Sequence, residues 1–495
     1  VPSLNALKGE EQEEDVSGRL FRFRCMLQDM DGPEFFLSSY TTRHKSKPGV
    51  AQQHSGLFRD TADCPEEHEM DLSGEQNETC ERHVYRCVPV PAESRWVLEH
   101  HGEQANCLPL PDLHCTLKVY DERMTQLLKL NQCLNVVGVL STEMQRRQTT
   151  AASEPQHGET KRARASQQLS LSLHAVRVDL LPHSNPKLPP NIRSFGDWKT
   201  GVGVPVKQLR SCLLDMFTCV LGGDDLAAEF LLLHLVSSVY VRKDVLAVGK
   251  LTLNLHNVGQ GGFAKSLSEL LQLLLSKVHY LPLTVSGLNA KSFVPRKDYE
   301  EERLIPGLLQ LSDGTQLLLD ETTMRPGQLN DTGVRNVAAL RSVITWQKLD
   351  YDFHFHTSEF HTDLNLLILS EGKSMLGSDC NLPLAPSRPS AAFDADAMTD
   401  ERLGGDKLDL ARAYLTLGRG GGAYAISEEL QQEIGEDFVS MRQADNSISA
   451  QHLHHLLLLA RLSALSQGEA ELSREMWTAA KQLEARRLQR LSAAP

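Results

Sequence analysis

The chain has 495 residues, enough for two or three domains and a large hydrophobic core. Its formal net charge of −13 disfavours broad electrostatic binding of nucleic acid. The ten cysteines include no C-x-x-C pair, so we expect buried, reduced thiols in an intracellular protein rather than a disulfide scaffold or a zinc ribbon. No signal peptide pattern is found, and the longest apolar runs are too short to span a bilayer, so no membrane association is expected.

Residues 1–145 are expected to form an all-β, OB-like domain. Apolar and polar residues alternate as they do in half-buried strands, in four runs at residues 21–27, 83–90, 113–120 and 134–140. Short strands with Gly138 inside the last run predict a small closed barrel. Acidic runs at 10–15 and 66–71, without an aromatic and basic groove, favour a structural barrel over one that binds single-stranded DNA.

The polar residues 146–169 predict a linker, and residues 170–385 then alternate between strand-like and helix-like segments. This alternation is typical of a mostly parallel α/β sheet. An amphipathic run predicts a helix at 206–220, and Asp224-Asp225 are placed to cap the next one. Strands are expected at 251–255, 281–285, 316–319 and 364–369.

The first chemical motif of this region is Gly259-Gln-Gly-Gly-Phe-Ala-Lys-Ser266, between a strand-like and a helix-like run. It is similar to the phosphate-binding loop G-x-x-x-x-G-K-[ST], with Ala264 in place of the last glycine. Gly259, Gly262 and the helix N-terminus would surround phosphate oxygens with backbone N–H groups, with Lys265 and Ser266 completing the site. A plain strand-to-helix turn that contains Lys and Ser is the alternative.

The second motif is the apolar strand 316–319, which runs into Asp320-Glu321. In P-loop ATPases such a pair holds Mg²⁺ and orients the attacking water. Both motifs follow strands at the edge where parallel sheets bind ligands. Weak ATP and Mg²⁺ binding is therefore conceivable, although no cofactor is assigned.

Residues 386–406, rich in proline, alanine and glycine, predict a second linker, and residues 407–495 predict a helical C-terminal domain. Two histidine groups need a separate interpretation; they comprise His354, His356 and His361, and His452, His454 and His455. Each group could contribute metal ligands, but a polar strand face or helix surface is the favoured interpretation, so no metal site is assigned.

Several longer stretches resemble the minichromosome maintenance (MCM) complex-binding protein family. They are the segments 23–30, 87–96, 226–235, 344–353 and 370–374, and the resemblance covers nearly the whole chain. The segment 99–108 is shorter here than in the family. The resemblance implies a nuclear protein that binds MCM helicase subunits, with the architecture of a degenerate MCM subunit. The expected fold class is α+β multidomain, with an OB-like barrel at 1–145, a degenerate AAA+-like α/β core at 170–385 and the C-terminal helical domain.

The comparison with MCM proteins weakens the case for catalysis. Ala264 resembles the MCM form of the loop, but Gln260-Gly261 stand where MCM loops have Asp-Pro. Ser370-Glu371 occupy the expected place of a phosphate-sensing Asn, and Glu371 would repel phosphate. Gln451 stands where MCM proteins carry a phosphate-contacting Arg, and Ser387-Arg388 resemble an arginine-finger site only weakly.

We therefore expect a non-enzymatic factor that binds, assembles or disassembles MCM subunits by subunit mimicry, without binding DNA directly. The alternative is an active AAA+ ATPase that remodels MCM complexes, and a single-strand-binding barrel protein ranks third. Trp346, Tyr351 and Phe353 fit either an interface or the core.

Overall fold

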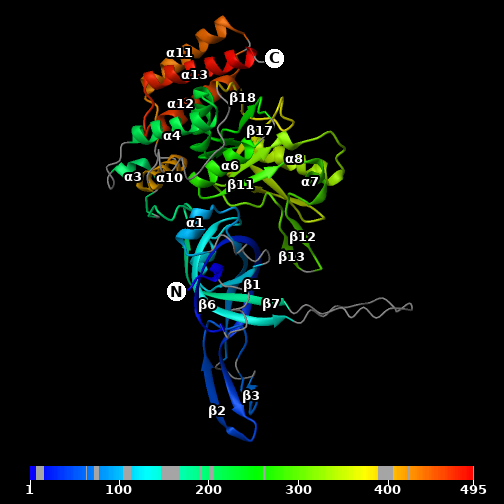
Figure 1. Ribbon diagram of the computed structural model, residues 1–495. Helices are drawn as coiled ribbons and strands as arrows, with labels where there is room; N and C mark the ends of the chain where they lie inside the picture. Colours follow the sequence, from blue (N-terminus) through cyan, green and yellow to red (C-terminus); the bar gives the residue numbers. More distant parts are fainter. Residues whose placement is uncertain are drawn as a thin grey trace, which may run out of the picture. The chain divides into compact units, whose positions relative to one another are not determined.

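The structure is a computed structural model (Figure 1). It describes residues 1–6, 16–62, 64–71, 77–103, 113–145, 168–189, 191–192, 194–199, 206–259, 262–300, 302–387, 405–420, 424–446 and 448–493. The chain divides into two compact units, which are described separately. Unit 1 comprises residues 1–91 and 102–181, and unit 2 comprises residues 92–101 and 182–495.

Unit 1 is built on a closed five-stranded barrel. Its strands and short helices are η1 (Leu4–Ala6), β1 (Leu20–His44), β2 (Lys47–Ser55), β3 (His68–Asp71), β4 (Glu78–Pro89), β5 (Cys115–Val119), α2 (Glu122–Thr125), β6 (Cys133–Gln145) and β7 (Gln168–Leu180). The barrel order is β1-β4-β5-β7-β6, and it closes because β6 also pairs with β1. Inward residues such as Phe23, Leu117 and Leu134 are fully buried, as the alternating pattern predicts.

The sequence predicts at least four strands, and the barrel contains a fifth, β7, that was not located. β7 pairs antiparallel with β6 along its whole length and parallel with β5. The predicted boundary at residue 170 is therefore wrong, because β7 belongs to the barrel and not to the α/β core. Most of the predicted linker, residues 146–167, lies outside the described residues.

Beyond the barrel, β1 continues as an arm that extends away from it (Figure 1). Residues 39–44 at the end of β1 pair with β2, and residues 41–44 also pair with β3. Nine cysteines, including the buried Cys25, Cys87 and Cys115, lie in the described part of the chain and are free thiols.

Unit 2 contains a five-stranded, fully parallel sheet of order β11-β14-β17-β10-β18. These strands are β10 (Leu253–His256), β11 (Val278–Pro282), β14 (Gln316–Asp320), β17 (Asn365–Leu369) and β18 (Cys380–Pro383). β14 and β17 are buried at every position, as expected for a parallel strand covered on both faces. The predicted parallel sheet is confirmed, although the strand expected at 281–285 lies a few residues earlier, as β11.

The helices of unit 2 and its smaller strands surround this sheet (Figure 1). The helices are α1 (Arg95–His100), α3 (Phe195–Lys199), α4 (Val206–Val220), α5 (Asp225–Leu235), α6 (Phe263–Leu274), α7 (Val285–Ala290), η3 (Glu321–Thr323), α8 (Asp331–Trp346), α10 (Gly405–Arg419), α11 (Glu428–Ala444), α12 (Ala450–Ser466) and α13 (Arg474–Ala493). β8 (Val241–Lys243) and β9 (Leu246–Val248) form a two-stranded hairpin. A separate four-stranded sheet consists of β12 (Arg296–Asp298), β13 (Arg303–Ile305), β15 (Lys348–Asp352) and β16 (Thr357–His361).

Local sequence explains several of these boundaries. The predicted cap of α5 is present, because the Asp224 carboxylate accepts the Ala227 N–H at 3.0 Å. α12 and α13 begin just after Ser449 and Ser473, inside the region 407–495 that was predicted to be helical. The C-terminal helices α10 to α13 share one hydrophobic cluster with the parallel sheet, so this helical region is packed into the core of unit 2. Among the described helices, none is both long and apolar enough to cross a bilayer.

Candidate functional site

The sheet order of unit 2 brings the two predicted motifs to one edge. β17 lies between β10 and β14, and all three strands are parallel, so their carboxyl ends meet. Gly259 follows β10, and Ser370-Glu371 follow β17. Asp320 ends β14, and Glu321 directly follows it. The two motifs therefore lie at one edge of the parallel sheet, and the segment after β17 lies between them.

The loop after β10 leads into α6 through Gly262, whose φ of 75° suits glycine. Just before the loop, the N–H groups of Asn257 and Val258 donate to the carbonyls of Glu371 and Ser370, at 3.1 and 3.2 Å. These two amides are therefore used within the protein. Gln260 and Gly261, which depart from the MCM pattern, lie outside the described residues.

Lys265 and Ser266 occupy the first turn of α6. The Lys265 side chain is 80% exposed, and its nearest ion-pair partner is Glu269 on the next turn, with 3.9 Å between the charged atoms. In the described part of the chain, no hydrogen bond or ion pair connects Lys265 with Asp320 or Glu321. The lysine that would reach a terminal phosphate therefore lies in solvent.

Asp320 is buried, and protein groups already bind its carboxylate. One oxygen accepts the N–H and the hydroxyl of Thr322, at 3.0 and 2.6 Å. The other accepts the Tyr280 hydroxyl at 2.6 Å. Burial and the neighbouring Asp320 carboxylate raise the pKa of Tyr280, so Tyr280 remains a donor over the physiological range. Asp320 thus caps η3 and anchors the adjacent strand β11.

Glu321 has a similar local role. Its carboxylate accepts the Ser374 hydroxyl at 2.9 Å, and the N–H groups of Met375 and Leu376 also donate to it. Burial raises the pKa of Glu321, although these hydrogen bonds oppose the shift. The side chain therefore holds the loop that follows β17.

A Mg²⁺–nucleotide site needs free carboxylate oxygens near the phosphate-binding lysine. Here the residues meet at one sheet edge, but the carboxylates are bound by Thr322, Tyr280 and Ser374 while Lys265 is solvated. This arrangement does not fit a Mg²⁺–nucleotide complex unless the side chains rearrange. Nucleotide binding at Gly259, Gly262, Lys265, Ser266, Asp320 and Glu321 stays a prediction.

These contacts predict different effects of two substitutions on the stability of the protein. Asp320→Ala should lower the free energy of unfolding by about 2–3 kcal/mol, because it leaves the partly buried donors of Tyr280 and Thr322 without their charged acceptor. Lys265→Ala should change it by less than about 0.5 kcal/mol, because the side chain is largely solvated. Urea unfolding followed by circular dichroism measures both. Equal stability of the two variants would contradict the structural role of Asp320.

The other predicted positions are Ser370, which lies at this edge, and Gln451 and Arg388. The Ser370 hydroxyl lies 3.1 Å from the side-chain oxygen of Asn254, an asparagine of β10 that none of the sequence motifs includes. Gln451 is exposed near the start of α12, and Arg388 lies outside the described residues.

The histidines serve other contacts. His354 accepts hydrogen bonds from Arg296 at 3.0–3.1 Å, and the His455 imidazole lies 3.4 Å from the Glu484 carboxylate. Among the described residues, no group of three or more His, Cys, Asp or Glu side chains is placed to hold a metal ion.

Comparison with known proteins decides the family. The chain matches the family described as mini-chromosome maintenance replisome factor, over residues 1–110 and 103–491. It belongs to this family. Its relatives include proteins named mini-chromosome maintenance complex-binding protein. The Gallus gallus relative is 35% identical, and the alignment covers 99% of this chain and 91% of the relative. The Homo sapiens relative is 34% identical with coverage of 99% and 91%. The Drosophila melanogaster relative is 33% identical with coverage of 96% and 90%.

This result confirms the resemblance found in the sequence. Family membership extends across both units, because the matched residues include the barrel, the parallel sheet and the C-terminal helices. The name of the relatives states that they bind the MCM complex.

Proposed function

We propose that this chain is a non-enzymatic binding and assembly factor for MCM helicase subunits, and that it acts in the nucleus. The observation that carries the proposal is the near full-length similarity to relatives named for binding the MCM complex. Because the similarity covers both units and is not confined to a single motif, it favours a binding function shared with these relatives.

The mechanism that we propose is subunit mimicry by a degenerate AAA+-like core next to an OB-like barrel. It is supported by the order of the parallel sheet. β17, which precedes the predicted sensor position, lies between β10 and β14, which precede the other two motifs. It is also supported by the loss of catalytic features, since Lys265 is solvated and Asp320 is bound by protein donors. Such a core could occupy the place of a genuine subunit beside an MCM partner without hydrolysing ATP.

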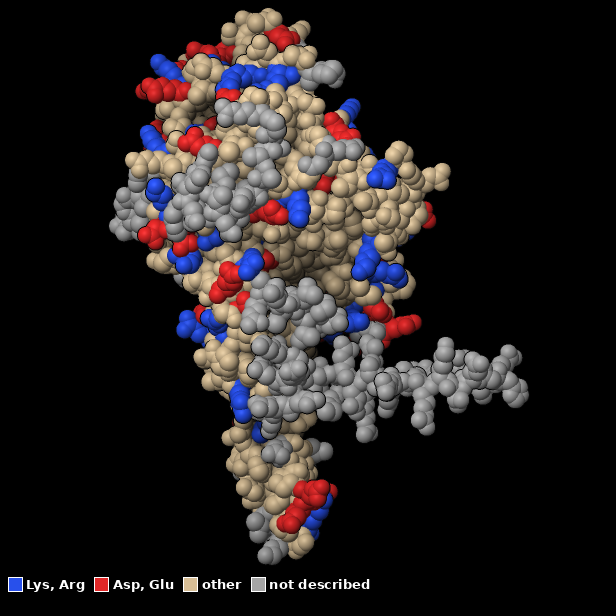
Figure 2. Space-filling view, viewed as in Figure 1, with Lys and Arg blue, Asp and Glu red and all other residues tan. Residues whose placement is uncertain are grey.

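Charge distribution favours a protein partner over DNA. The net charge is −13, and on the face drawn in Figure 2 basic and acidic side chains of the described residues are interspersed. Binding to nucleic acid usually relies on a basic patch or stripe that replaces counterions along the backbone. An acidic protein suits partners with basic surfaces instead.

The second candidate is an active AAA+ ATPase that remodels MCM complexes. The observation in its favour is the meeting of the three motif segments at one sheet edge. A rearrangement that frees Asp320 from Tyr280 and turns Lys265 inward would be needed before catalysis. Measured ATP turnover distinguishes this candidate from the first.

The partner assignment is tested by affinity purification of the tagged chain from nuclear extract, with mass spectrometry of the bound proteins. We expect MCM subunits in near-equal molar amounts to the chain, at physiological salt. Their absence, with the chain folded and nuclear, would contradict the proposal.

A further inference from the structure

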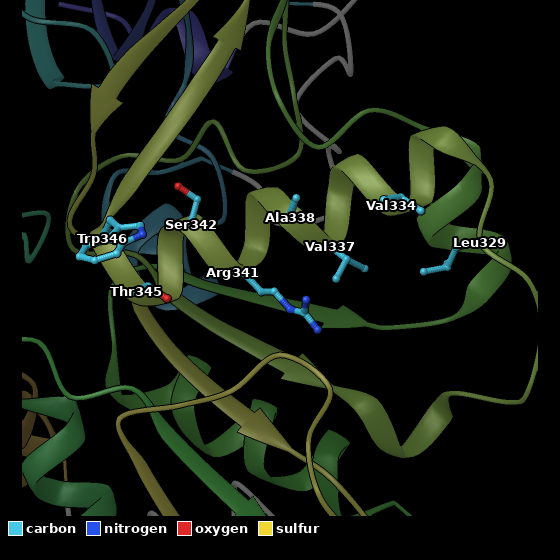
Figure 3. A pocket seen from close by; sticks show the side chains of 8 residues that line it. All are labelled: Leu329, Val334, Val337, Ala338, Arg341, Ser342, Thr345 and Trp346. Carbon is cyan, nitrogen blue, oxygen red and sulfur yellow. The ribbon is translucent and has the colours of Figure 1, made fainter.

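A shallow groove of about 450 Å³ runs along the outer side of α8. It is lined by Leu329, Val334, Val337, Ala338, Arg341, Ser342, Thr345 and Trp346 (Figure 3). Val334 is 57% exposed and Trp346 is 39% exposed, whereas Val337 is buried, so apolar side chains on one stretch of α8 remain accessible beside the groove. The groove thus has an apolar floor and exposed apolar ends.

The spacing of these residues has the form of a helix-packing surface. Val334, Ala338, Ser342 and Trp346 follow one another at i+4, and Val337, Arg341 and Thr345 form a second i+4 row beside them. Two such rows are the ridges between which a ridge of another helix packs. The small side chains of Ala338 and Ser342 leave room in the middle of the first row. From Val334 to Trp346 the groove spans about 18 Å, the length of roughly three helical turns.

The charges at the groove are positive, although the chain as a whole is acidic. Arg341 lines it, and its guanidinium is held by a hydrogen bond to the Met375 carbonyl at 2.7 Å. At the Trp346 end, Arg242 donates to the carbonyls of Gln347 and Thr362. In the described part of the chain, Arg341 forms no ion pair, and no acidic side chain lines the groove.

We propose that the α8 groove is a docking site for an amphipathic helix of a partner protein that carries apolar side chains on one face and an Asp or Glu beside them. The apolar side chains pack between the two rows, and the carboxylate pairs with Arg341. The proposal rests on the proposed function, under which the helix belongs to an MCM subunit. Tryptophan and arginine are among the side chains that most often dominate binding energy at interfaces. In the α8 groove, Trp346 and Arg341 lie beside the small side chains of Ala338 and Ser342.

Three substitutions test the groove in the full-length chain: Val334→Glu, Ala338→Glu and Arg341→Glu. The first two affect exposed side chains, and all three place negative charge where the partner helix is expected to be acidic. The matched control is Val439→Glu on α11, where the valine is 54% exposed. Arg341→Lys retains the charge and serves as the conservative variant. Circular dichroism and thermal unfolding verify that each variant is folded.

Affinity for the MCM subunits recovered with the wild-type chain is then measured by biolayer interferometry at physiological salt. We expect each groove variant to bind about tenfold or more weakly, with Val439→Glu unchanged and Arg341→Lys close to wild type. Folded groove variants that bind as tightly as the wild type would overturn the docking site while leaving the proposed function intact. If the wild-type chain itself binds no MCM subunit, the proposed function is contradicted. The assignment of the partner helix to an MCM subunit is then contradicted as well.

Discussion

We expect the purified chain to release phosphate from ATP at less than about 0.1 s⁻¹, below the rate of 1 s⁻¹ or more that is typical of enzymes. In the AAA+-like architecture that we propose, Ser370-Glu371 stand at the expected place of the sensor Asn, and Gln451 stands at that of the phosphate-contacting Arg. If each loss removes about 2–4 kcal/mol of transition-state stabilisation, the rate falls by roughly three to six orders of magnitude. The solvated Lys265 and the bound Asp320 carboxylate act in the same direction.

Phosphate release is measured with the chain alone, and with MCM subunits whose own phosphate-loop lysines are mutated. Lys265→Ala provides the control for contaminating ATPases. Steady turnover above about 0.1 s⁻¹ that disappears in Lys265→Ala would refute the non-enzymatic account. Weak ATP binding without turnover would agree with it.

The second large effect is expected for Glu484→Gln in α13. Glu484 is buried and accepts two hydrogen bonds from Arg487, at 2.7 and 2.8 Å. Arg487 also donates to the Asn381 carbonyl at 2.8 Å, which ties α13 to β18. Loss of the carboxylate charge leaves the buried guanidinium uncompensated, so the free energy of unfolding should fall by about 3–5 kcal/mol. Urea unfolding of the full-length chain measures this loss.

The same ion pair predicts a pH dependence. Burial opposes ionisation of Glu484, but the hydrogen bonds and charges of Arg487 and His455 outweigh it and lower its pKa from the usual 4.5 to about 2. A lowered pKa in the folded state contributes stability that is fully present above the unfolded pKa and is lost as the pH falls from 4.5 towards about 2. Glu484→Gln should remove this contribution and flatten the decline in that range.

Glu475→Gln is the matched control, because this exposed glutamate lies in the first turn of the same helix. It should change stability by no more than about 1 kcal/mol, the usual limit for an exposed charge near a helix terminus. A Glu484→Gln variant as stable as this control would contradict the structural importance of the Glu484–Arg487 pair.

The barrel shows what the sequence could and could not predict. Alternation located four of its strands, because inward side chains such as Phe23 and Leu117 are buried at every second position. β7 also alternates, but the long polar segment before it resembles a linker between domains. The pairing of β7 with β5 and β6 is a long-range contact that local pattern does not specify.

At the candidate site, the rule that parallel strands end together was sufficient to bring Gly259 and Asp320 to one edge. The hydrogen-bond donors to the Asp320 carboxylate could not be predicted, because Tyr280 lies on a neighbouring strand, 40 residues away in the chain. The segment 344–353 was likewise ambiguous. The structure buries Tyr351 completely and leaves Trp346 partly exposed at the end of α8, which depends on packing that composition does not reveal.

Subunit mimicry is tested most directly by competition among purified proteins. An MCM subunit that binds the chain is first paired with its genuine neighbour, and the chain is then added in excess while native mass spectrometry records the complexes formed. The account predicts that the chain replaces the neighbour, giving a binary complex without ATP hydrolysis. A ternary complex that retains the neighbour, with the chain bound elsewhere on the subunit, would contradict mimicry.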